Sequence, residues 1–338
     1  MTAMTIPARR RMQRLCAAAI LVPAVFLSAC GSPAVSGSDG AGSAAGQGGT
    51  LSIATGGTGG VYYPLGGGFS TVIRDNVKGY DATVQETNAS VDNMLLLENG
   101  SAQIAFGVGD VVSDAVEGAG EFKGKPLALC SLGNIYNNFM QAVTVDGPGI
   151  HNVKDMAGKV ISVGAPSSAT EVAALRILEA AGIDPKTGIE RRQLGAAETV
   201  AALRDGTIDA GFWSGGLPTG ALIDLASDGD MKLLSIGEYA DPLAQKYGAY
   251  YVKQDIPANT YEGQGEAVSA IASPNILVAS KKMGTQLQQD ITTALFDHKD
   301  ALVKVHPAAG EMDRATAGDV SFVETCPGSK AYFDKSGS

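Results

Sequence analysis

The chain has 338 residues and a formal net charge of −10, from 25 basic and 35 acidic residues. It shows no basic stripe, and because neutralising phosphates requires clustered lysine and arginine, we expect no nucleic-acid partner. Only three histidines are present, and none has metal-ligand spacing to a cysteine or another histidine, so zinc and iron sites lack ligands. We therefore expect neither a metal nor a cofactor.

The N-terminal 29 residues predict a lipoprotein signal peptide. Four arginines between positions 9 and 14 precede an apolar run over 15–27, which is shorter than the ~20 residues that a membrane-spanning helix needs. The run leads into Leu-Ser-Ala-Cys, ending at Cys30, which resembles the bacterial lipobox. Acylation of Cys30 would hold the protein outside the cell, anchored to the membrane by lipid, whereas a plain secretory peptide would leave it unanchored.

The segment 30–49 predicts a flexible tether, because after Cys30 it is almost wholly glycine, alanine and serine. About 20 residues of this composition reach roughly 25 Å. Losing the four arginines of the signal leaves 21 basic and 35 acidic residues, a net charge of −14. The remaining ~290 residues suit two lobes or two domains, and we expect a monomer.

Short apolar runs alternate with helical periodicity through the rest of the chain. This order predicts an α/β fold with largely parallel sheets, whose ligands bind at the carboxyl ends of strands. The strands are predicted over 50–55, 82–86, 104–107, 127–132, 141–145, 160–163, 208–213 and 232–236, with helices between them.

Two segments of the same design predict two lobes. Residues 54–68 and 162–182 each read as a strand, a turn rich in glycine or serine, and a helix. The turn signal at 146–149 and the apolar stretch at 268–279 mark the passages between lobes. We expect lobe one to comprise 50–145 and 266–338, and lobe two 146–265.

The glycine-rich turn 56–60 matches neither nucleotide motif. After Gly57 and Gly59, the third position of the dinucleotide pattern is Tyr62, and no Gly-Lys-Ser/Thr follows. The turn instead exposes backbone amides before a helix that starts near Pro64, and such an end attracts an anion. Tyr62 and Tyr63 either offer a ligand a hydroxyl or an aromatic wall, or are simply half-buried packing residues.

Three further turns have the same character. Ser168 and Glu171 have the spacing of a capping box, which predicts a helix start at Ser168 beside free amides. Asn88-Ala89-Ser90 precedes a helix over 91–99, and Asp110 precedes one over 111–117. Helix capping alone is the alternative for each of these turns.

The sequence offers little for catalysis. It lacks the Gly-x-Ser-x-Gly elbow, and Asp224 and Asp228 fit a solvated helix face better than a catalytic pair, so we expect no enzyme. Cys16 leaves with the signal, and Cys130 and Cys326 remain beside Cys30. In an exported protein these two form either a disulfide or two buried thiols.

Several segments in order resemble the TAXI family of solute receptors for tripartite ATP-independent periplasmic (TRAP) transporters. They are TGGTGGVYYPLGGG, NASVDNMLLLENGSAQIAFGVGD, SVGAPSSATE, LRDGTIDAGFWSGGLPTGAL, IPANTYEGQ and CPGSKAYF. The resemblance covers about 50–335 and implies a type II periplasmic-binding fold, with two doubly wound lobes, a hinge and a central cleft. It also implies a small organic acid ligand (a glutamate-like amino acid, a dicarboxylate or a 2-oxoacid) and a TRAP-type membrane permease as partner.

The resemblance further implies which residues contact the ligand. They are Thr58, Gly59, Val61, Tyr62, Ser90 and Asp110 in lobe one, and Ser167, Ser168, Thr170, Trp213, Gly216, Leu217 and Pro218 in lobe two. The chain departs from the family at Ala89, Ser167 and Ala169, where glycine is common, and at Cys326, where histidine is frequent. The cysteine favours the disulfide. A receptor for an ABC importer and a membrane-tethered enzyme acting on an anionic substrate remain alternatives.

Overall fold

The computed structural model describes residues 48–336, so the predicted signal, Cys30 and nearly all of the tether lie outside the described residues. The described strands are β1 (Gly49–Ala54), β2 (Tyr80–Gln85), β3 (Ile104–Val108), β4 (Leu129–Thr144), β5 (Val160–Ser162), β6 (Glu190–Arg192), β7 (Ala210–Gly215), β8 (Lys232–Leu234), β9 (Val252–Ile256) and β10 (Val268–Ser280). The described helices are α1 (Tyr62–Asn76), α2 (Ser90–Glu98), α3 (Gly109–Glu117), α4 (Ala169–Ala180), α5 (Ala196–Arg204), α6 (Gly220–Ala226), α7 (Ala240–Tyr247), α8 (Thr285–Asp297), α9 (Lys299–Val305) and α10 (Pro327–Phe333). Over the same span, no helix has both the length and the apolar character that crossing a membrane requires.

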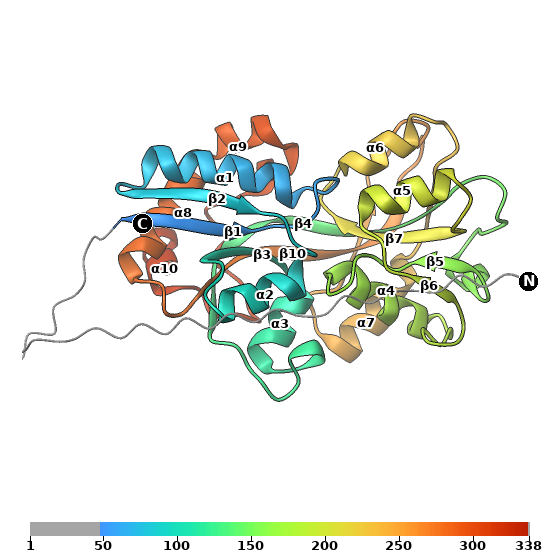
Figure 1. The fold of residues 1–338 in the computed structure, drawn as a ribbon, viewed down its shortest axis with the longest axis horizontal. Coiled ribbons are helices and arrows are strands. Elements are labelled where there is room, and N and C mark those ends of the chain that lie inside the picture. Colours follow the sequence, from blue (N-terminus) through green and yellow to red (C-terminus); the bar gives the residue numbers. More distant parts are fainter. Residues whose placement is uncertain (1–47, 337–338) are drawn as a thin grey trace, which may run out of the picture. The chain divides into compact units, whose positions relative to one another are not determined.

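The described strands form one sheet in the order β2-β1-β3-β10-β4-β7-β5-β6, with β8 added on β4 and β9 on β10. Lobe one is built on β1, β2 and β3, and lobe two on β5, β6 and β7. Helices cover both faces of each part, with α1 and α2 on opposite faces of lobe one, and α5 and α4 on opposite faces of lobe two (Figure 1). This confirms the predicted α/β fold of two doubly wound lobes.

Two long strands, β4 and β10, run through both lobes and pair with each other in antiparallel orientation. The prediction of largely parallel sheets therefore holds for β1 with β2 and β3 and for β5 with β6 and β7, and fails at β4 and β10. The separate strands predicted at 127–132 and 141–145 are wrong, because they belong to the single strand β4. Most of β4 is buried, with Asn134 and Asn137 half-buried, and the polar residues between those two runs pair with β10, so its polar centre is not a turn.

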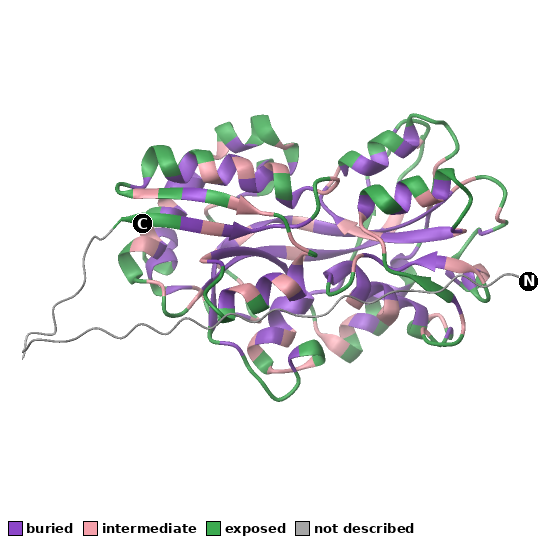
Figure 2. Cartoon of the chain, viewed as in Figure 1, coloured by how far each residue is buried: buried purple, intermediate pink, exposed green. Residues whose placement is uncertain are grey.

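Each lobe has its own hydrophobic packing. Lobe one surrounds a core in which Phe69 and Phe106 stack with ring centroids 5.3 Å apart. Lobe two packs around two clusters, one containing Ile177 and Phe212 and the other Leu222. Figure 2 shows the buried residues concentrated on the sheet and the inner helix faces, with exposed residues on the outer faces. Burial of these apolar faces is the main force that holds each lobe together.

The remaining cysteines form a disulfide between Cys130 and Cys326, with Cα atoms 4.9 Å apart. Cys130 lies near the start of β4, and Cys326 directly precedes α10. The structure thus contains the first of the two alternatives that the sequence left open. The bond ties the C-terminal helix of lobe one to a strand that both lobes share.

The first turn of α4 forms much as predicted. The Ser168 hydroxyl accepts a hydrogen bond from the Glu171 amide at 3.1 Å, so the helix begins where the sequence indicates. The Glu171 carboxylate accepts from the amide of Ser167 rather than that of Ser168, at 2.8 Å, and it also pairs with Arg191. Only the serine half of the capping box is therefore present.

Candidate ligand-binding site

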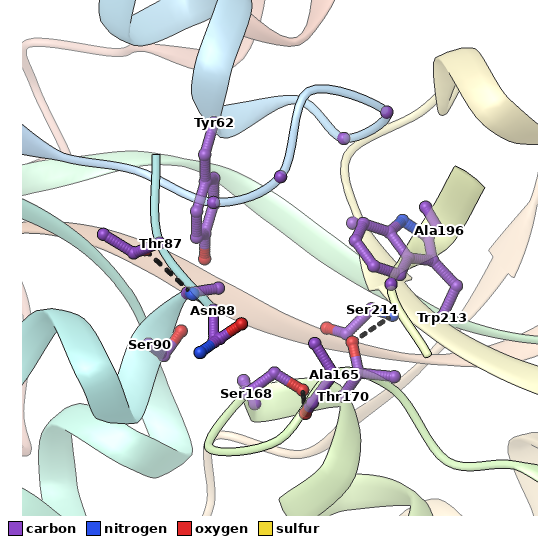
Figure 3. Close-up of a pocket in the computed structure, with 18 of the residues that line it drawn as sticks. Tyr62, Thr87, Asn88, Ser90, Ala165, Ser168, Thr170, Ala196, Trp213 and Ser214 are labelled. Atoms are coloured by element: carbon purple, nitrogen blue, oxygen red, sulfur yellow. Dashed lines mark hydrogen bonds between the residues drawn. The ribbon is translucent and has the colours of Figure 1, made fainter. Parts of the chain in front are cut away.

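A cavity of about 570 Å³ lies between the two lobes. Lobe one lines it with the turn before α1 and the segment between β2 and α2, and lobe two with the loops before α4 and α5 and the end of β7 (Figure 3). Its described lining comprises residues 56–62, 86–90, 92, 108, 136, 165–166, 168–170, 193–198 and 213–215. These are the carboxyl ends of strands and the amino ends of helices, where ligands of α/β proteins bind.

The structure brings together most of the predicted ligand contacts. Those that line the cavity are Thr58, Gly59, Val61, Tyr62, Ser90, Ser168, Thr170 and Trp213. In Figure 3, Tyr62 and Ser90 from lobe one face Thr170 and Trp213 from lobe two across the space. Their contact with a ligand stays a prediction, but their convergence from separate parts of the sequence is a finding.

Asp110 does not line this cavity, contrary to the prediction. The first turn of α3 is buried behind the cavity wall, and one Asp110 carboxylate oxygen accepts a hydrogen bond from the Tyr251 hydroxyl at 2.6 Å. The other oxygen accepts from the amide of Val111 at 2.7 Å. The carboxylate is therefore occupied by protein partners.

Ser167 is also absent from the lining, because it lies on the exposed side of the turn before α4. Its backbone has φ +60°, which glycine adopts readily and serine does not. Its carbonyl oxygen accepts hydrogen bonds from the amides of Val91 and Asp92, at 3.2 and 3.4 Å. Through this carbonyl, Ser167 contacts α2 of the other lobe.

The predicted turn Gly216-Leu217-Pro218 lies outside the cavity as well. A Cβ atom added at Gly216 would lie 2.9 Å from the Tyr136 ring and 3.3 Å from Ala308, so this turn packs tightly against lobe one. The Pro218 carbonyl oxygen lies 3.2 Å from Nε2 of His306. The turn therefore joins the lobes beside the long strands and leaves the cavity wall to Trp213, Ser214 and Gly215.

Hydroxyl groups from both lobes reach the cavity. The Tyr62 hydroxyl donates to Oδ1 of Asn275 at 2.9 Å and accepts from Nδ2 of Asn138 at 3.2 Å, which fixes the ring on the two long strands. Burial raises the pKa of Tyr62 far above its usual range, so the phenol stays neutral. Thr170 accepts from the Ser214 amide at 3.0 Å, and its own hydroxyl proton remains available to a ligand.

Two polar groups on the lining are buried and have no hydrogen-bond partner among the described residues. They are the hydroxyl of Tyr136 and the indole Nε1 of Trp213. An unsatisfied buried polar group costs about 1–3 kcal/mol.

Helix N-termini supply the positive side of the site. Helices α1 and α5 begin at the cavity without a side-chain cap, so their first amides are not satisfied by side chains. Helix α4 is capped by Ser168, while Ala169 and Thr170 of its first turn line the cavity. Together these ends favour a negatively charged group.

The charged side chains on the lining are all acidic. Glu86, Asp92 and Glu198 contribute carboxylates, and no lysine, arginine or histidine of the described chain lines the cavity. An anionic group is thus served by backbone amides and neutral side chains such as the Thr170 hydroxyl, without a cation on the described lining. A cationic group would find carboxylates on both lobes, since Glu86 and Asp92 belong to lobe one and Glu198 to lobe two.

The sequence did not reveal the loop 193–198, which forms a large part of the lobe-two wall. It follows β6, a three-residue exposed strand without hydrophobic alternation, so no strand was predicted before it. The available signal was the small-residue run Gly195-Ala196-Ala197 at the start of a helix. Glu86 and Thr87 were also missed, although Glu86 ends the strand predicted over 82–86 and Thr87 follows it; Asn88 belongs to the turn that the sequence predicted.

Close backbone contacts join the lobes at the cavity. The Gly59 carbonyl accepts a hydrogen bond from the Ala221 amide at 3.2 Å, and a Cβ at Gly59 would lie 3.3 Å from Ala197. A Cβ at Gly60 would lie 3.0 Å from the Trp213 ring. The glycines of this turn therefore allow lobe one to approach lobe two closely. Within residues 48–336, no three His, Cys, Asp or Glu residues are grouped to hold a metal ion.

The family described as NMT1-like matches residues 53–337. Among solved structures, MatC from Rhodopseudomonas palustris with bound malate superposes with a TM-score of 0.54, at 10% identity over 78% of this chain and 89% of MatC. A Bordetella bronchiseptica RB50 protein gives 0.50, at 17% identity over 85% and 82%. The periplasmic aliphatic sulphonate binding protein SsuA from Escherichia coli gives 0.43, at 13% identity over 84% and 82%. The first two similarities support the expected type II fold, with a hinge and a central cleft.

Proposed function

The chain belongs to the NMT1-like family, and on that premise we propose that it is an extracytoplasmic solute receptor that binds a small organic acid and performs no chemistry on it. The observation that carries the proposal is the cavity between two lobes, lined by helix N-termini and hydroxyls from both. A ligand that touches both lobes binds the closed form better than an open one. It therefore shifts the receptor toward closure.

Among small organic acids, the lining favours an α-amino acid with an uncharged side chain. One carboxylate suits the amides at the starts of α1, α4 and α5. An ammonium group would be paired by Glu86, Asp92 or Glu198. A dicarboxylate or glutamate would bring a second carboxylate without a matching cation on the described lining, and a 2-oxoacid lacks the ammonium group that the carboxylates of the lining would pair. We expect each to bind more weakly.

Isothermal titration of the purified protein with L-glutamine, L-glutamate, L-malate and 2-oxoglutarate tests this ligand class. We expect L-glutamine to bind at least about tenfold more tightly than L-malate, a difference of about 1.4 kcal/mol. Native mass spectrometry of the protein as purified identifies any acid that it carries. If no acid binds and none co-purifies, the receptor proposal is wrong.

A pair of variants on one helix tests the position of the site. Ala197→Trp places an indole on the cavity wall, and we expect it to abolish binding of L-glutamine. Ala201→Trp, one turn further along α5, is exposed and outside the lining, so it should leave binding intact. Equal affinity in both variants would place the ligand elsewhere.

We further propose that the receptor delivers its ligand to a TRAP-type permease, and that acylated Cys30 and the tether 30–49 hold it near that partner. The lobes would comprise 50–145 with 266–338, and 146–265. Uptake of labelled ligand into membrane vesicles separates the two transporter classes, since a TRAP permease needs an ion gradient and an ABC importer needs ATP. Cys30→Ser should release the receptor from the membrane fraction without changing its affinity.

A further inference from the structure

A buried polar cluster joins the lobes behind the cavity wall. It consists of Asp110 and Asp114 on α3 of lobe one, Arg176 on α4 of lobe two, and Tyr247 and Tyr251 at and after the end of α7 in lobe two. Val108, the last residue of β3, lines the cavity and is followed directly by α3. Ala169 and Thr170, in the first turn of α4, also line the cavity, and Arg176 lies further along that helix.

Arg176 is the centre of this cluster. Its Nη2 lies 2.6 Å from Oδ2 of Asp114, and its Nη1 lies 3.8 Å from Oδ2 of Asp110. The Arg176 side chain is 11% exposed, and those of Asp110 and Asp114 are 1% and 14% exposed. Opposite charges from different lobes are therefore removed together from water.

Tyrosines of lobe two hold the guanidinium in place. Nη1 of Arg176 donates to the Tyr251 hydroxyl at 3.0 Å, and Cζ lies 4.1 Å from the centre of the Tyr247 ring. The Tyr251 hydroxyl in turn donates to Asp110 at 2.6 Å. Burial raises the pKa of Tyr251 well above its usual range, so this phenol remains a donor.

If the lobes separate, Arg176 keeps its contacts to the tyrosines and loses its contacts to the carboxylates. Arg176 keeps its packing on Tyr247 and its hydrogen bond to Tyr251, because all three belong to lobe two. It loses both carboxylates, which remain with α3. Since the guanidinium is already oriented, closing the lobes requires little further ordering of this side chain.

We propose that Arg176 is a positioning residue that holds the two lobes in the closed arrangement before any ligand arrives, by pairing with Asp110 and Asp114. This clasp (Arg176, Asp110, Asp114 and Tyr251) sets how often the cavity is assembled. Its effect on ligand affinity rests on the proposed receptor function, because affinity falls in proportion to the fraction of molecules in the binding-competent form. Its effect on lobe closure is independent of the proposed receptor function.

Amide hydrogen exchange of the ligand-free protein tests the clasp directly. The Ala221 amide donates to Gly59, and the Val91 amide donates to Ser167, so both report contacts between lobes and neither touches Arg176. We expect Arg176→Met to speed exchange at both amides by about tenfold, within the range of coupling between distant sites. Unchanged exchange at both, with faster exchange confined to α3 and α4, would show a purely local role and overturn the proposal.

The chain offers a matched control. Arg204 also pairs with two carboxylates, Asp224 and Asp228, but all three lie in lobe two. Arg204→Met should leave exchange of the Val91 amide unchanged, because Arg204 contacts α6, which carries Ala221, and not α2. Should Arg176→Met fail to fold, Asp114→Asn keeps Asp110 as a partner and should speed both amides by a smaller factor. No change in that folded variant would also overturn the proposal.

A titration with L-glutamine separates this inference from the proposed function. If both are right, Arg176→Met weakens L-glutamine binding by about the factor seen in exchange, and Arg204→Met does not. If exchange responds and no acid binds the wild-type protein, the clasp stands and the receptor function falls. If L-glutamine binds both proteins equally and exchange is unchanged, the function stands and the clasp falls.

Discussion

The Ser167 carbonyl oxygen in lobe two accepts a hydrogen bond from the Val91 amide in lobe one, 3.2 Å away. On each side of this contact, one residue has a backbone conformation that favours glycine. Ser167 has φ +60°, and Ala89, two residues before Val91, has φ +76°. Because Val91 and Asp92 are the first amides of α2 after Ser90, the contact satisfies donors that a ligand would otherwise use. The negatively charged end of a ligand is thereby left to α1, α4 and α5.

Replacing Ala89 by glycine should stabilise the protein. At φ +76° and ψ −142° the alanine Cβ is strained, and relieving such strain is worth about 1–3 kcal/mol, partly offset by the greater freedom of glycine when unfolded. We expect a net gain of about 1 kcal/mol in the free energy of unfolding, measured by urea titration. Ala169→Gly, at the first residue of α4, should instead be neutral or destabilising. A loss of stability in Ala89→Gly would contradict this account.

Trp213 should report ligand binding by its fluorescence. It is the single tryptophan of the sequence, it lines the cavity, and its indole Nε1 is buried without a partner among the described residues. Closure of the lobes or a ligand against the ring changes its surroundings. We expect the emission maximum or intensity to shift on titration with L-glutamine, and Trp213→Phe to abolish the signal. Heat release in calorimetry with constant emission would exclude this position for the ring.

Removing the disulfide should destabilise lobe one. Cys130 and Cys326 are 196 positions apart, so the bond restricts the unfolded chain strongly. We expect the double variant Cys130→Ala with Cys326→Ala to lose about 2–5 kcal/mol in urea unfolding. The cavity does not include either residue, so the affinity of the folded fraction for L-glutamine should stay the same. A variant as stable as the wild type would show that the bond is dispensable.

The burial of His306 should make stability depend on pH. Burial lowers the pKa of His306, whose Nδ1 accepts from the Ala308 amide at 3.2 Å while Nε2 lies 3.2 Å from the Pro218 carbonyl oxygen. A lowered pKa means that the fold favours the neutral ring. The stabilisation is therefore complete above the ordinary histidine pKa of about 6.5 and is lost as the pH falls through the lowered value.

His306→Gln isolates this contribution. We expect the free energy of unfolding of the wild type to exceed that of His306→Gln by more at pH 7.5 than at pH 5, as measured by urea titration at both values. Carboxylates that titrate near pH 5 are common to both proteins and cancel in the difference. If this difference in the free energy of unfolding is larger at pH 5 than at pH 7.5, the fold favours the charged ring and the prediction is wrong.

Local patterns determined much of this protein from the sequence alone. The glycine turn before α1 and the Ser168 start of α4 depend on residues within one or two turns of each other, so periodicity and capping identified them. The same local signals identified most strands of both lobes. The common design of residues 54–68 and 162–182 predicted two lobes for the same reason, since each lobe folds from its own strand, turn and helix.

The tertiary structure alone decided which of those turns face one cavity. Asp110 and Thr170 both follow the end of a strand, yet Thr170 lines the cavity and Asp110 is taken by Tyr251, which lies 141 positions away. Partners distant in the chain also decide three other features. These are the continuity of β4, the role of 193–198 and the placement of Gly216 against Tyr136. Hydrogen bonds and packing between distant residues leave no periodic pattern in either segment, so only the folded arrangement of the two lobes determines them.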